Sequence, residues 1–273
     1  MDSIELTAAQ RSKEWFENRN DKVTASMAGA ILGENKWATR TDAMKIMLGI
    51  DTFNGNDATR YGEQNEPIAL ASLSDKTGLD VRECGSFYIE NERWLMASPD
   101  GIIDGDNIVE IKCPYSMRNE KTKGFKSISE QPHYYAQVQV QLYCTNAKYC
   151  YFYQWSEHKD RLEIVERCDE WLLKNIPILK GFHDEYLKIK EYQETADKYK
   201  ELQIDIKEKQ DELDCLKNII VDISNHNNID FVGDLKVTQV KRKGSVNYKI
   251  IPELKGVDLD WYRNADTSYY KIS

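Results

Sequence analysis

The segment SPDGIIDGDNIVEIKCP, residues 98–114, sets charged side chains into an otherwise apolar run. Asp100 lies in its first half, and Glu110 and Lys112 stand two positions apart in its second half. Side chains two apart on a β-strand share a face, so a strand over residues 107–112 would present Glu110 and Lys112 together. A tight turn can then bring Asp100 beside Glu110. The spacing predicts two carboxylates that face one lysine.

Such a group of charges favours a metal-dependent hydrolase. Two carboxylates a few ångströms apart repel each other, and a hard divalent cation with oxygen ligands relieves that repulsion. Mg²⁺ is the physiological choice, with Mn²⁺ as a substitute. Mg²⁺ retains several waters and suits phosphate substrates, so we expect phosphodiester hydrolysis, in which Lys112 orients the attacking water or neutralises charge.

Each part of this pattern is common by itself. E-x-K occurs on salt-bridged surface strands, and S-P-D-G is usually only a turn. An EF-hand calcium loop does not fit, because taking Glu110 as its twelfth residue makes Pro99 the first ligand. The combination of both parts, with E-I-K inside an apolar strand, is what favours a site.

The composition is that of an ordinary globular protein with one principal core. The 273 residues are 41% hydrophobic, and no apolar run approaches the roughly 18 residues needed to cross a bilayer. The N-terminal segment lacks the features of a secretory signal, so we expect a cytoplasmic protein without a membrane partner and with reduced cysteines. The cysteines form no C-x-x-C pair and the histidines no H-x3-5-H pair, which argues against zinc and iron–sulfur sites.

Charge is unevenly distributed along the chain. The net charge of −9 argues against nucleic acid, because phosphate affinity comes from lysine and arginine. Residues 111–126, however, carry five basic side chains against one acid, and residues 236–249 carry five with none. Each run is either a nucleic-acid contact or a solvated face.

The elements that would position the site follow from caps and periodicity. Helices are expected to begin near Thr7 and Thr24, and another is expected to end at Gly49. Further along, the pattern predicts strands at 86–90, 93–97 and 107–112, a helix from Pro132 to about Cys144, strands in KYCYFYQW and LEIVER, and a helix from Asp169. This order predicts an α/β core wrapped by helices.

A long helical pattern follows the core. Residues 182–224 contain no glycine or proline, and apolar residues recur there at steps of three and four. The resulting heptad seam consists of Tyr199, Leu202, Ile206, Lys209, Leu213, Leu216, Ile220 and Ile223. Either this helix lies on the protein's own core, or its seam forms a coiled coil or binds a partner. The last 40 or so residues suggest a small basic hairpin and a tail.

The SPDG and EIKCP segments, with nine residues between Asp100 and Glu110, closely resemble the P-D…(D/E)-x-K nuclease core. They resemble most specifically the phage lambda-type alkaline exonucleases, also called YqaJ-like viral recombinases. Three further segments agree with that family: RNDKVTAS with R-x-x-x-x-T-A-S, YGEQNE with Y-G-x-x-x-E, and YYAQVQVQLY with its A-Q-V-Q helix. Together these motifs cover about residues 10–170.

The resemblance implies a fold and a division of the chain. The expected fold is a restriction-endonuclease-like core, with a central mixed β-sheet flanked by helices, followed by a long C-terminal helix and a small β-hairpin. The expected parts are a nuclease domain over 1–180, the heptad-like helix over 181–228, and the basic hairpin with the C-terminal tail over 229–273.

The resemblance also implies roles for residues of the central motif. Asp100 and Glu110 would bind the metal together with the main-chain carbonyl of Ile111. Lys112 would be the catalytic lysine.

Four residues outside that motif would complete the site by resemblance. Glu66 and Gln137 would join the catalytic group, and Arg19 and Ser26 would hold the 5′-phosphate of a DNA end. The residues alone leave other interpretations open. Glu66 precedes a proline and could cap a helix start, while Gln137 and Gln141 could form an exposed polar stripe.

The implied function is a Mg²⁺-dependent 5′–3′ exodeoxyribonuclease that acts on the ends of linear double-stranded DNA. It would leave 3′ single strands for a phage-type annealing protein, in a phage- or prophage-encoded setting in the bacterial cytoplasm. The family forms a ring-shaped trimer, but the long helix after residue 180 departs from lambda's own enzyme and leaves the homo-oligomer open.

Two alternatives to this function remain. One is an endonuclease on the same core, although no separate sequence-reading module such as a helix-turn-helix stands out. The other is a non-catalytic DNA-binding scaffold, against which the intact Asp100, Glu110 and Lys112 argue.

Overall fold

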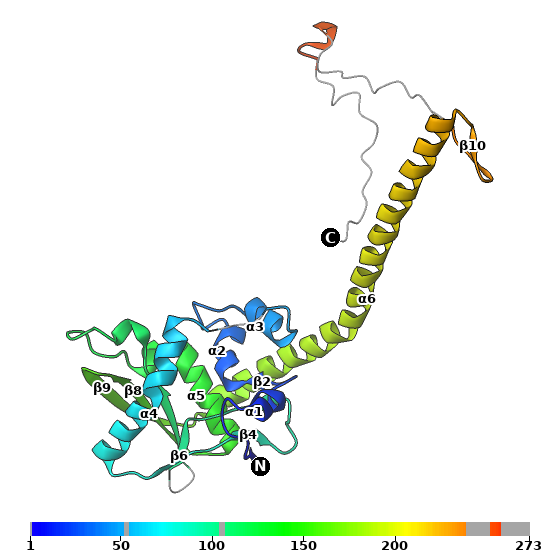
Figure 1. Ribbon diagram of the computed structural model, residues 1–273. Helices are drawn as coiled ribbons and strands as arrows, with labels where there is room; N and C mark the ends of the chain where they lie inside the picture. The colour runs from blue at the N-terminus through cyan, green and yellow to red at the C-terminus, as the bar shows by residue number, and fades with distance from the viewer. Residues whose placement is uncertain (1, 52–54, 104–106, 239–251, 258–273) are drawn as a thin grey trace. The chain divides into compact units, whose positions relative to one another are not determined.

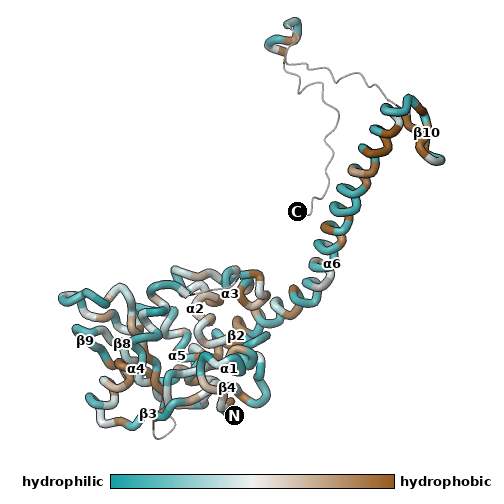
Figure 2. The backbone as a smooth tube through the Cα atoms, viewed as in Figure 1, coloured by the Kyte–Doolittle hydropathy of each residue, from teal (hydrophilic) through white to brown (hydrophobic). Residues whose placement is uncertain are grey.

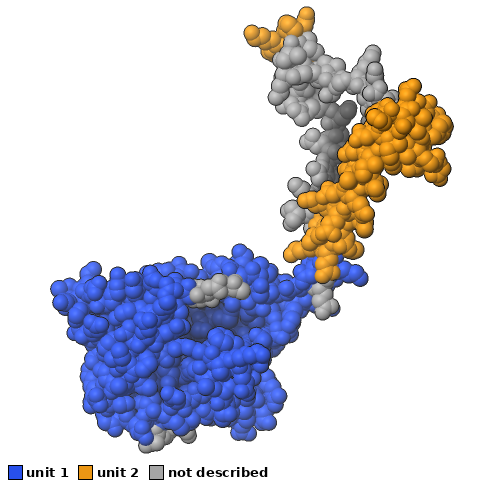
Figure 3. All heavy atoms as spheres, viewed as in Figure 1, with its two compact units in different colours: residues 1–199 blue, residues 200–273 orange. Residues whose placement is uncertain are grey.

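The computed structural model describes residues 2–51, 55–103, 107–238 and 252–257. Figure 1 shows the course of the chain and its helices and strands. The chain divides into two compact units, residues 1–199 and residues 200–273 (Figure 3). All residues that the sequence proposes for chemistry belong to the first unit.

A five-stranded mixed sheet lies at the centre of the first unit. Its strands, in spatial order, are β3 (Val81–Arg82), β6 (Gly101–Ile103), β7 (Asn107–Lys112), β8 (Tyr149–Ser156) and β9 (Lys159–Glu166). The pair β7 and β8 is parallel, and the other neighbours are antiparallel. A parallel pair needs a crossover connection, which here contains helix α5 (Pro132–Thr145). β7 is therefore the middle strand of the sheet.

Helices cover both faces of this sheet (Figure 1). On one face Ile108 of β7 packs in a cluster with Leu142 of α5. On the other face Val109 packs with Leu73 of α4 (Asp57–Thr77). Successive strand residues point to opposite faces, so the even-numbered residues of β7 share the face of α5. The α/β fold predicted from the sequence is confirmed.

Two smaller strand pairs complete the first unit. β1 (Ser3–Leu6) is antiparallel to β4 (Ser86–Ile89), and β2 (Val23–Thr24) is parallel to β5 (Leu95–Met96). Each pair joins segments that are far apart in the sequence. The sequence pattern predicts β4 and β5 but not β1, β2, β3 or β6, which have two to four residues each.

The helices before residue 50 are shorter than the sequence suggested. α1 (Lys13–Asn18) begins after Ser12, whose hydroxyl accepts the N–H of Trp15 at 3.2 Å, so the expected start near Thr7 is wrong. After Thr24 the chain forms a 3-10 turn, η1 (Ala25–Met27), and then α2 (Ala28–Ile31), without a hydrogen bond from the Thr24 side chain. α3 (Arg40–Met47) has a full capping box and ends before Gly49.

α4 extends on both sides of Pro67. Asn56 caps its first turn, and Gly78, in the left-handed conformation with φ of 70°, ends it. Proline lacks an N–H, so the helix forgoes one backbone hydrogen bond at this position. Glu66 consequently lies in the middle of a helix, and the interpretation of Glu66 as a cap at a helix start is wrong.

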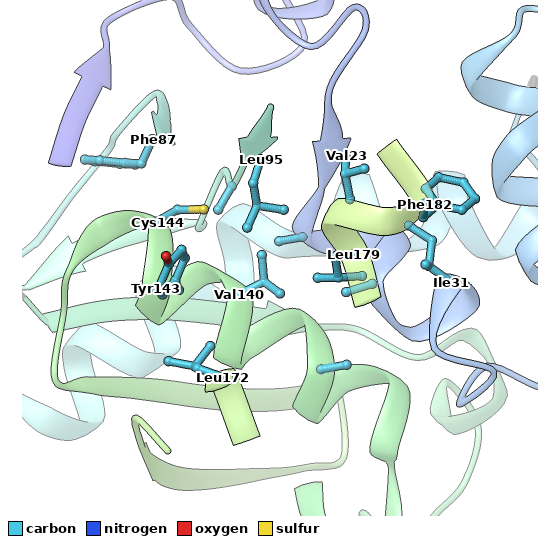
Figure 4. Packing of buried hydrophobic residues seen from close by; sticks show 14 of the residues in the cluster. Val23, Ile31, Phe87, Leu95, Val140, Tyr143, Cys144, Leu172, Leu179 and Phe182 are labelled. Carbon is cyan, nitrogen blue, oxygen red and sulfur yellow. The ribbon is translucent and has the colours of Figure 1, made fainter. Parts of the chain in front are cut away.

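The largest apolar cluster of the first unit surrounds α5 (Figure 4). Val140 of α5 and Leu95 of β5 belong to it, together with Leu179 and Phe182 of α6 (Asp169–Asn227). The beginning of α6 is thus part of the core of the first unit. Two short 3-10 turns, η2 (Tyr115–Met117) and η3 (Ile128–Glu130), lie in the connection between β7 and α5.

The second unit contains the remainder of α6, the hairpin of β10 (Phe231–Val232) and β11 (Leu235–Lys236), and the turn η5 (Pro252–Leu254). Hydrophobic and hydrophilic residues are interspersed along α6 (Figure 2). Residues 239–251, which carry most of the second basic run, lie outside the described residues. None of the helices that the structure describes has the length and apolar character needed to span a membrane.

Candidate active site

Glu110 is a buried carboxylate at the centre of β7. Its side chain is 2% exposed, and burying a charge is costly unless hydrogen bonds and an opposite charge compensate it. Gln137 Nε2 donates to Glu110 Oε1, and Gln141 Nε2 donates to Glu110 Oε2, each at 2.6 Å. Lys112 Nζ also donates to Glu110 Oε1 in an ion pair. Donors from α5 and from β7 itself therefore hold both carboxylate oxygens.

The two glutamines that hold this carboxylate lie one turn apart on α5. Gln141 is buried, so Gln137 and Gln141 do not form an exposed polar stripe. The Oε1 atom of Gln141 is buried and has no hydrogen-bond partner among the described residues. An acceptor left open beside Glu110 suits a water molecule bound in the site.

Asp100 directly precedes β6 and reaches across to β7. Its Oδ2 accepts the N–H of Ile111 at 2.6 Å, and its own N–H donates to the carbonyl of Val109 at 2.9 Å. Burial raises the pKa of Asp100 well above its ordinary value, and the charges of Glu110 and Glu66 raise this pKa further. The fold therefore gathers like charges around Asp100, which is a condition that favours a bound cation.

Lys112 is the last residue of β7 and supplies the positive charge of the site. Its Nζ pairs with Glu110 and lies 5.1 Å from the ring centre of Tyr134. Burial by itself would lower the pKa of Lys112, but the neighbouring Glu110 raises it above the ordinary value because a carboxylate stabilises the ammonium. In this arrangement Lys112 is a cation that can orient a water or a phosphate.

Glu66 approaches the site from α4 and is held by Arg11, which no sequence motif indicated. Arg11 Nη2 donates to Glu66 Oε2 at 2.8 Å. Arg11 has a φ of 66°, in the left-handed region that non-glycine residues seldom adopt. Nothing in the sequence around Arg11 signals this contact, because the two residues are 55 positions apart.

Two clefts meet at this point of the first unit. The smaller, of about 490 Å³, is lined by Asp100 and by Cys84. The larger, of about 1290 Å³, is lined by Lys112 and Tyr134 among others. Arg11, Glu66 and Ile111 line both clefts. Asp100 is therefore reached from the smaller cleft, Lys112 from the larger and Glu66 from both, whereas the buried Glu110 lines neither.

Arg19 lies in a separate polar group before β2. Its Nη1 donates to the hydroxyl of Ser98 at 3.3 Å, and its guanidinium stacks 4.0 Å from the ring centre of Trp15. Trp15 Nε1 donates to the same hydroxyl at 3.2 Å. Burial lowers the pKa of Arg19 to about 10, which still leaves the side chain charged at neutral pH.

The second residue expected at a 5′-phosphate, Ser26, is exposed, and its hydroxyl lies 3.2 Å from that of Thr24. The nearby surface carboxylate Glu17 pairs with Lys13 at 3.4 Å rather than with Arg19. Ser98 was visible in the SPDG motif, but its type suggested only a turn. Its hydrogen bonds show that it belongs with Arg19.

The donor set fits a hard divalent cation with few protein ligands. Among the residues that the structure describes, no group of three or more His, Cys, Asp or Glu side chains could hold a metal ion. Asp100 and Glu110 offer two carboxylates, however, and the open Oε1 atom of Gln141 suits a coordinated water. Mg²⁺ is commonly bound in this way, through one or two carboxylates and several waters.

A mixed sheet between helices, with a carboxylate and a lysine on its middle strand and a second carboxylate just before the neighbouring strand, defines the class of PD-(D/E)xK nuclease folds. Residues 14–148 match the family model described as the YqaJ-like viral recombinase domain. Residues 14–148 therefore form a YqaJ-like viral recombinase domain, as the sequence predicted.

Solved structures support the same assignment. The alkaline exonuclease LHK-Exo from Laribacter hongkongensis is 28% identical with a TM-score of 0.59, and the match covers 69% of this chain and 99% of that one. The same enzyme in complex with dAMP is 27% identical with a TM-score of 0.60 and the same coverage. The similarity therefore spans nearly the whole of that enzyme.

An uncharacterised protein of Acanthamoeba polyphaga mimivirus is 26% identical over 185 residues. The match covers 63% of this chain and 33% of the viral protein. The chain thus spans about a third of the length of that relative.

Proposed function

We propose that the protein is a divalent-metal-dependent exodeoxyribonuclease that degrades linear double-stranded DNA from its 5′ ends. The observation that carries this proposal is the grouping of Asp100, Glu110 and Lys112, of which Asp100 lines one cleft and Lys112 the neighbouring one. The similarity to LHK-Exo supports it, because that protein is described as an alkaline exonuclease and one of its structures contains dAMP. A deoxynucleoside monophosphate is the kind of product that an exonuclease releases.

In the proposed reaction, Asp100, Glu110 and the main-chain carbonyl of Ile111 would hold Mg²⁺, or Mn²⁺ in its place, with Glu66 beside them. The ion would supply polarisation of the phosphoryl oxygen and a water of lowered pKa. Lys112 would orient that water or neutralise the charge of the phosphate.

The surrounding residues would keep these groups in position. Gln137 and Gln141 fix both oxygens of Glu110, so its carboxylate is already oriented before substrate binds. Arg11 holds Glu66 at the border of the two clefts, and its partly exposed guanidinium can exchange Glu66 for a DNA phosphate.

The proposed direction of digestion rests on the group around Arg19. A charged guanidinium with a serine hydroxyl beside it is suited to a terminal phosphate, and such a pocket recognises an end rather than a base sequence. Ser26 would add a second hydroxyl. The 3′ strands left by the enzyme would serve a phage-type annealing protein in the cytoplasm of a bacterial host.

Hydrolysis of linear and of covalently closed circular duplex in Mg²⁺ distinguishes an exonuclease from an endonuclease on the same core. We expect nucleotides to be released from linear DNA and none from the closed circle. Glu110→Ala should abolish release, Lys112→Ala should slow it by roughly 10² to 10⁴, and the exposed Glu157→Ala should leave it unchanged. Cleavage of the closed circle would favour the endonuclease. Wild-type rates with Glu110→Ala would contradict a catalytic role.

A further inference from the structure

The larger of the two clefts has an exposed tryptophan on its lining. Trp37 lies between α2 and α3, and 69% of its surface is accessible to solvent. Tryptophan has the largest side chain among the residues with an apolar ring, and it is seldom this exposed. Exposed apolar surface within a cleft can mark a ligand-binding site. The same cleft is lined by Lys112 of the candidate active site.

Trp37 is held in place by its surroundings. Its backbone N–H donates to Asn35 Oδ1 at 2.9 Å, and the preceding N–H groups of Glu34 and Asn35 donate to the carbonyl of Gly29 at 2.8 and 3.1 Å. The rings of Trp37 and His133 meet nearly at right angles, with centres 5.2 Å apart and an interplanar angle of 78°. Lys36 Nζ lies over the Trp37 ring, 4.3 Å from its centre, and with 69% of the residue exposed the indole still offers surface to a flat ligand. Little ordering is then needed when a flat ligand binds.

A second aromatic group lines the cleft near the first basic run. Tyr115 packs against Tyr61 with ring centres 5.7 Å apart, and the guanidinium of Arg118 stacks 3.7 Å from the centre of the Tyr115 ring. The cleft therefore combines aromatic surfaces with cations, and Lys112 and Arg118 supply charge that a phosphate backbone requires. The acidic residues of the lining are Asp42, Asp51, Glu63 and Glu66; Asp42 accepts the N–H of Thr39 in the capping box of α3, and Glu63 and Glu66 pair with Arg11.

We propose that this cleft binds an unpaired DNA strand next to the reacting phosphate, with one nucleobase stacked on Trp37. The inference rests on the proposed nuclease function and names a residue that positions its substrate. Stacking on an aromatic ring tolerates every base, because all bases have a π-face. A digesting enzyme that must accept any sequence needs contacts of this kind rather than hydrogen bonds to base edges.

The test measures binding without hydrolysis. Fluorescence anisotropy with a labelled short oligothymidylate in EDTA reports affinity for wild type, Trp37→Ala and Trp37→Phe. We expect Trp37→Ala to weaken binding by about five- to a hundredfold and Trp37→Phe to retain most of the affinity. Tyr192→Ala is the matched control, because Tyr192 is also 69% exposed but lies on α6 and lines none of the described clefts at the site. It should bind as wild type does.

A strand of the same length made of abasic sites separates stacking from phosphate contacts. Trp37→Ala and wild type should bind this strand equally, because no base is present to stack. An equal loss on both strands, no loss on the thymidine strand, or no binding of either strand by wild type would overturn the proposal. Failure of the nuclease assignment is seen separately, in nucleotide release with Mg²⁺ and its dependence on Glu110.

Discussion

At the scale of single residues, the site is an arrangement of like charges that only partly neutralise one another. Glu110 has three donors, Glu66 has Arg11, and Asp100 has one backbone N–H. The pKa of Asp100 is accordingly the one that burial and its neighbours raise well above the ordinary value. Removing the charge of Asp100 should therefore relieve electrostatic repulsion in the metal-free protein and should also remove activity.

Asp100→Asn should stabilise the metal-free protein and abolish hydrolysis. Asparagine retains an oxygen to accept the N–H of Ile111 but carries no charge. A gain of about 1 kcal/mol would raise Tm by roughly 2–4 °C in a protein of this size. A carboxyl with a raised pKa binds its proton more tightly in the folded state, so wild type loses stability as pH rises above the ordinary pKa of aspartate.

The difference in Tm between Asp100→Asn and wild type should therefore be largest at neutral pH. It should shrink as pH falls and Asp100 of the wild type becomes protonated. Thermal unfolding in EDTA across pH measures it, with the exposed Asp75→Asn of α4 as the control. A lower Tm for Asp100→Asn at neutral pH would show that the charge at this position is already compensated.

Arg19 makes a second prediction at this scale. Wild type should digest 5′-phosphorylated duplex faster than 5′-hydroxyl duplex, by roughly ten- to a thousandfold if one or two charge-assisted hydrogen bonds are made. Arg19→Ala should remove most of that preference, whereas Lys13→Ala, on the exposed side of α1, should retain it. The measurement is the ratio of the initial digestion rates on the 5′-phosphorylated and the 5′-hydroxyl duplex. Equal rates for wild type would leave Arg19 a structural role with Trp15 and Ser98.

At the scale of elements, local pattern predicted the long segments and missed the short ones. β7, α5, β8 and β9 have six or more residues with a clear period, and the sequence placed each of them. β1 to β3 have two to four residues and depend on partners far along the chain, which no local window contains.

The contacts of the candidate site likewise divide into those that local spacing predicts and those that only the fold shows. Spacing alone placed Glu110 with Lys112 on one face of β7, and Gln137 with Gln141 on one face of α5. It did not show that both glutamines hold Glu110. The pairing of Arg11 with Glu66 joins two distant elements through an unusual backbone conformation. Only the folded chain reveals it.

The contact between α2 and α5 gives a prediction at this scale. A Cβ atom on Gly29 would lie 2.8 Å from both Cα and Cβ of His133, so α2 can approach α5 this closely only with glycine. Gly29→Ala should lower Tm by several degrees, because a backbone atom must move. Gly181 in α6 has open space around its Cβ position, and Gly181→Ala should raise stability slightly through its helix propensity. Differential scanning calorimetry compares the two. Equal Tm values would contradict the close packing.

At the scale of the whole molecule, the heptad seam of the second unit is an apolar surface in need of a partner. Leu202, Ile206, Leu213 and Leu216 are each 50–68% exposed. Exposed seams at a period of 3.5 residues are typical of coiled coils. With Tyr199 at position a, Glu212 falls at g and Lys217 at the following e.

That placement of charge supports a second copy of the chain as the partner. In a parallel pair of helices, residue g of one strand faces the following e of the other, so Glu212 and Lys217 would form two symmetric ion pairs. Lys209 occupies a core position and pairs with Glu212 on its own helix at 3.1 Å. A lysine in the seam lowers stability and limits the register. We therefore propose a homo-oligomer held through this helix.

Light scattering of the full chain tests this proposal. Wild type should have a mass at least twice the 31.8 kDa of one chain, and Leu213→Asp combined with Leu216→Asp should reduce it, because each charge would be buried in the seam. Asn218→Asp, at the outward position f, adds a charge without entering the seam and should leave the mass unchanged. Because these residues are remote in sequence from residues 14–148, the variant should retain nucleotide release from linear DNA. A wild-type mass equal to one chain would contradict the oligomer, and an unchanged mass in the seam variant would place its contacts elsewhere.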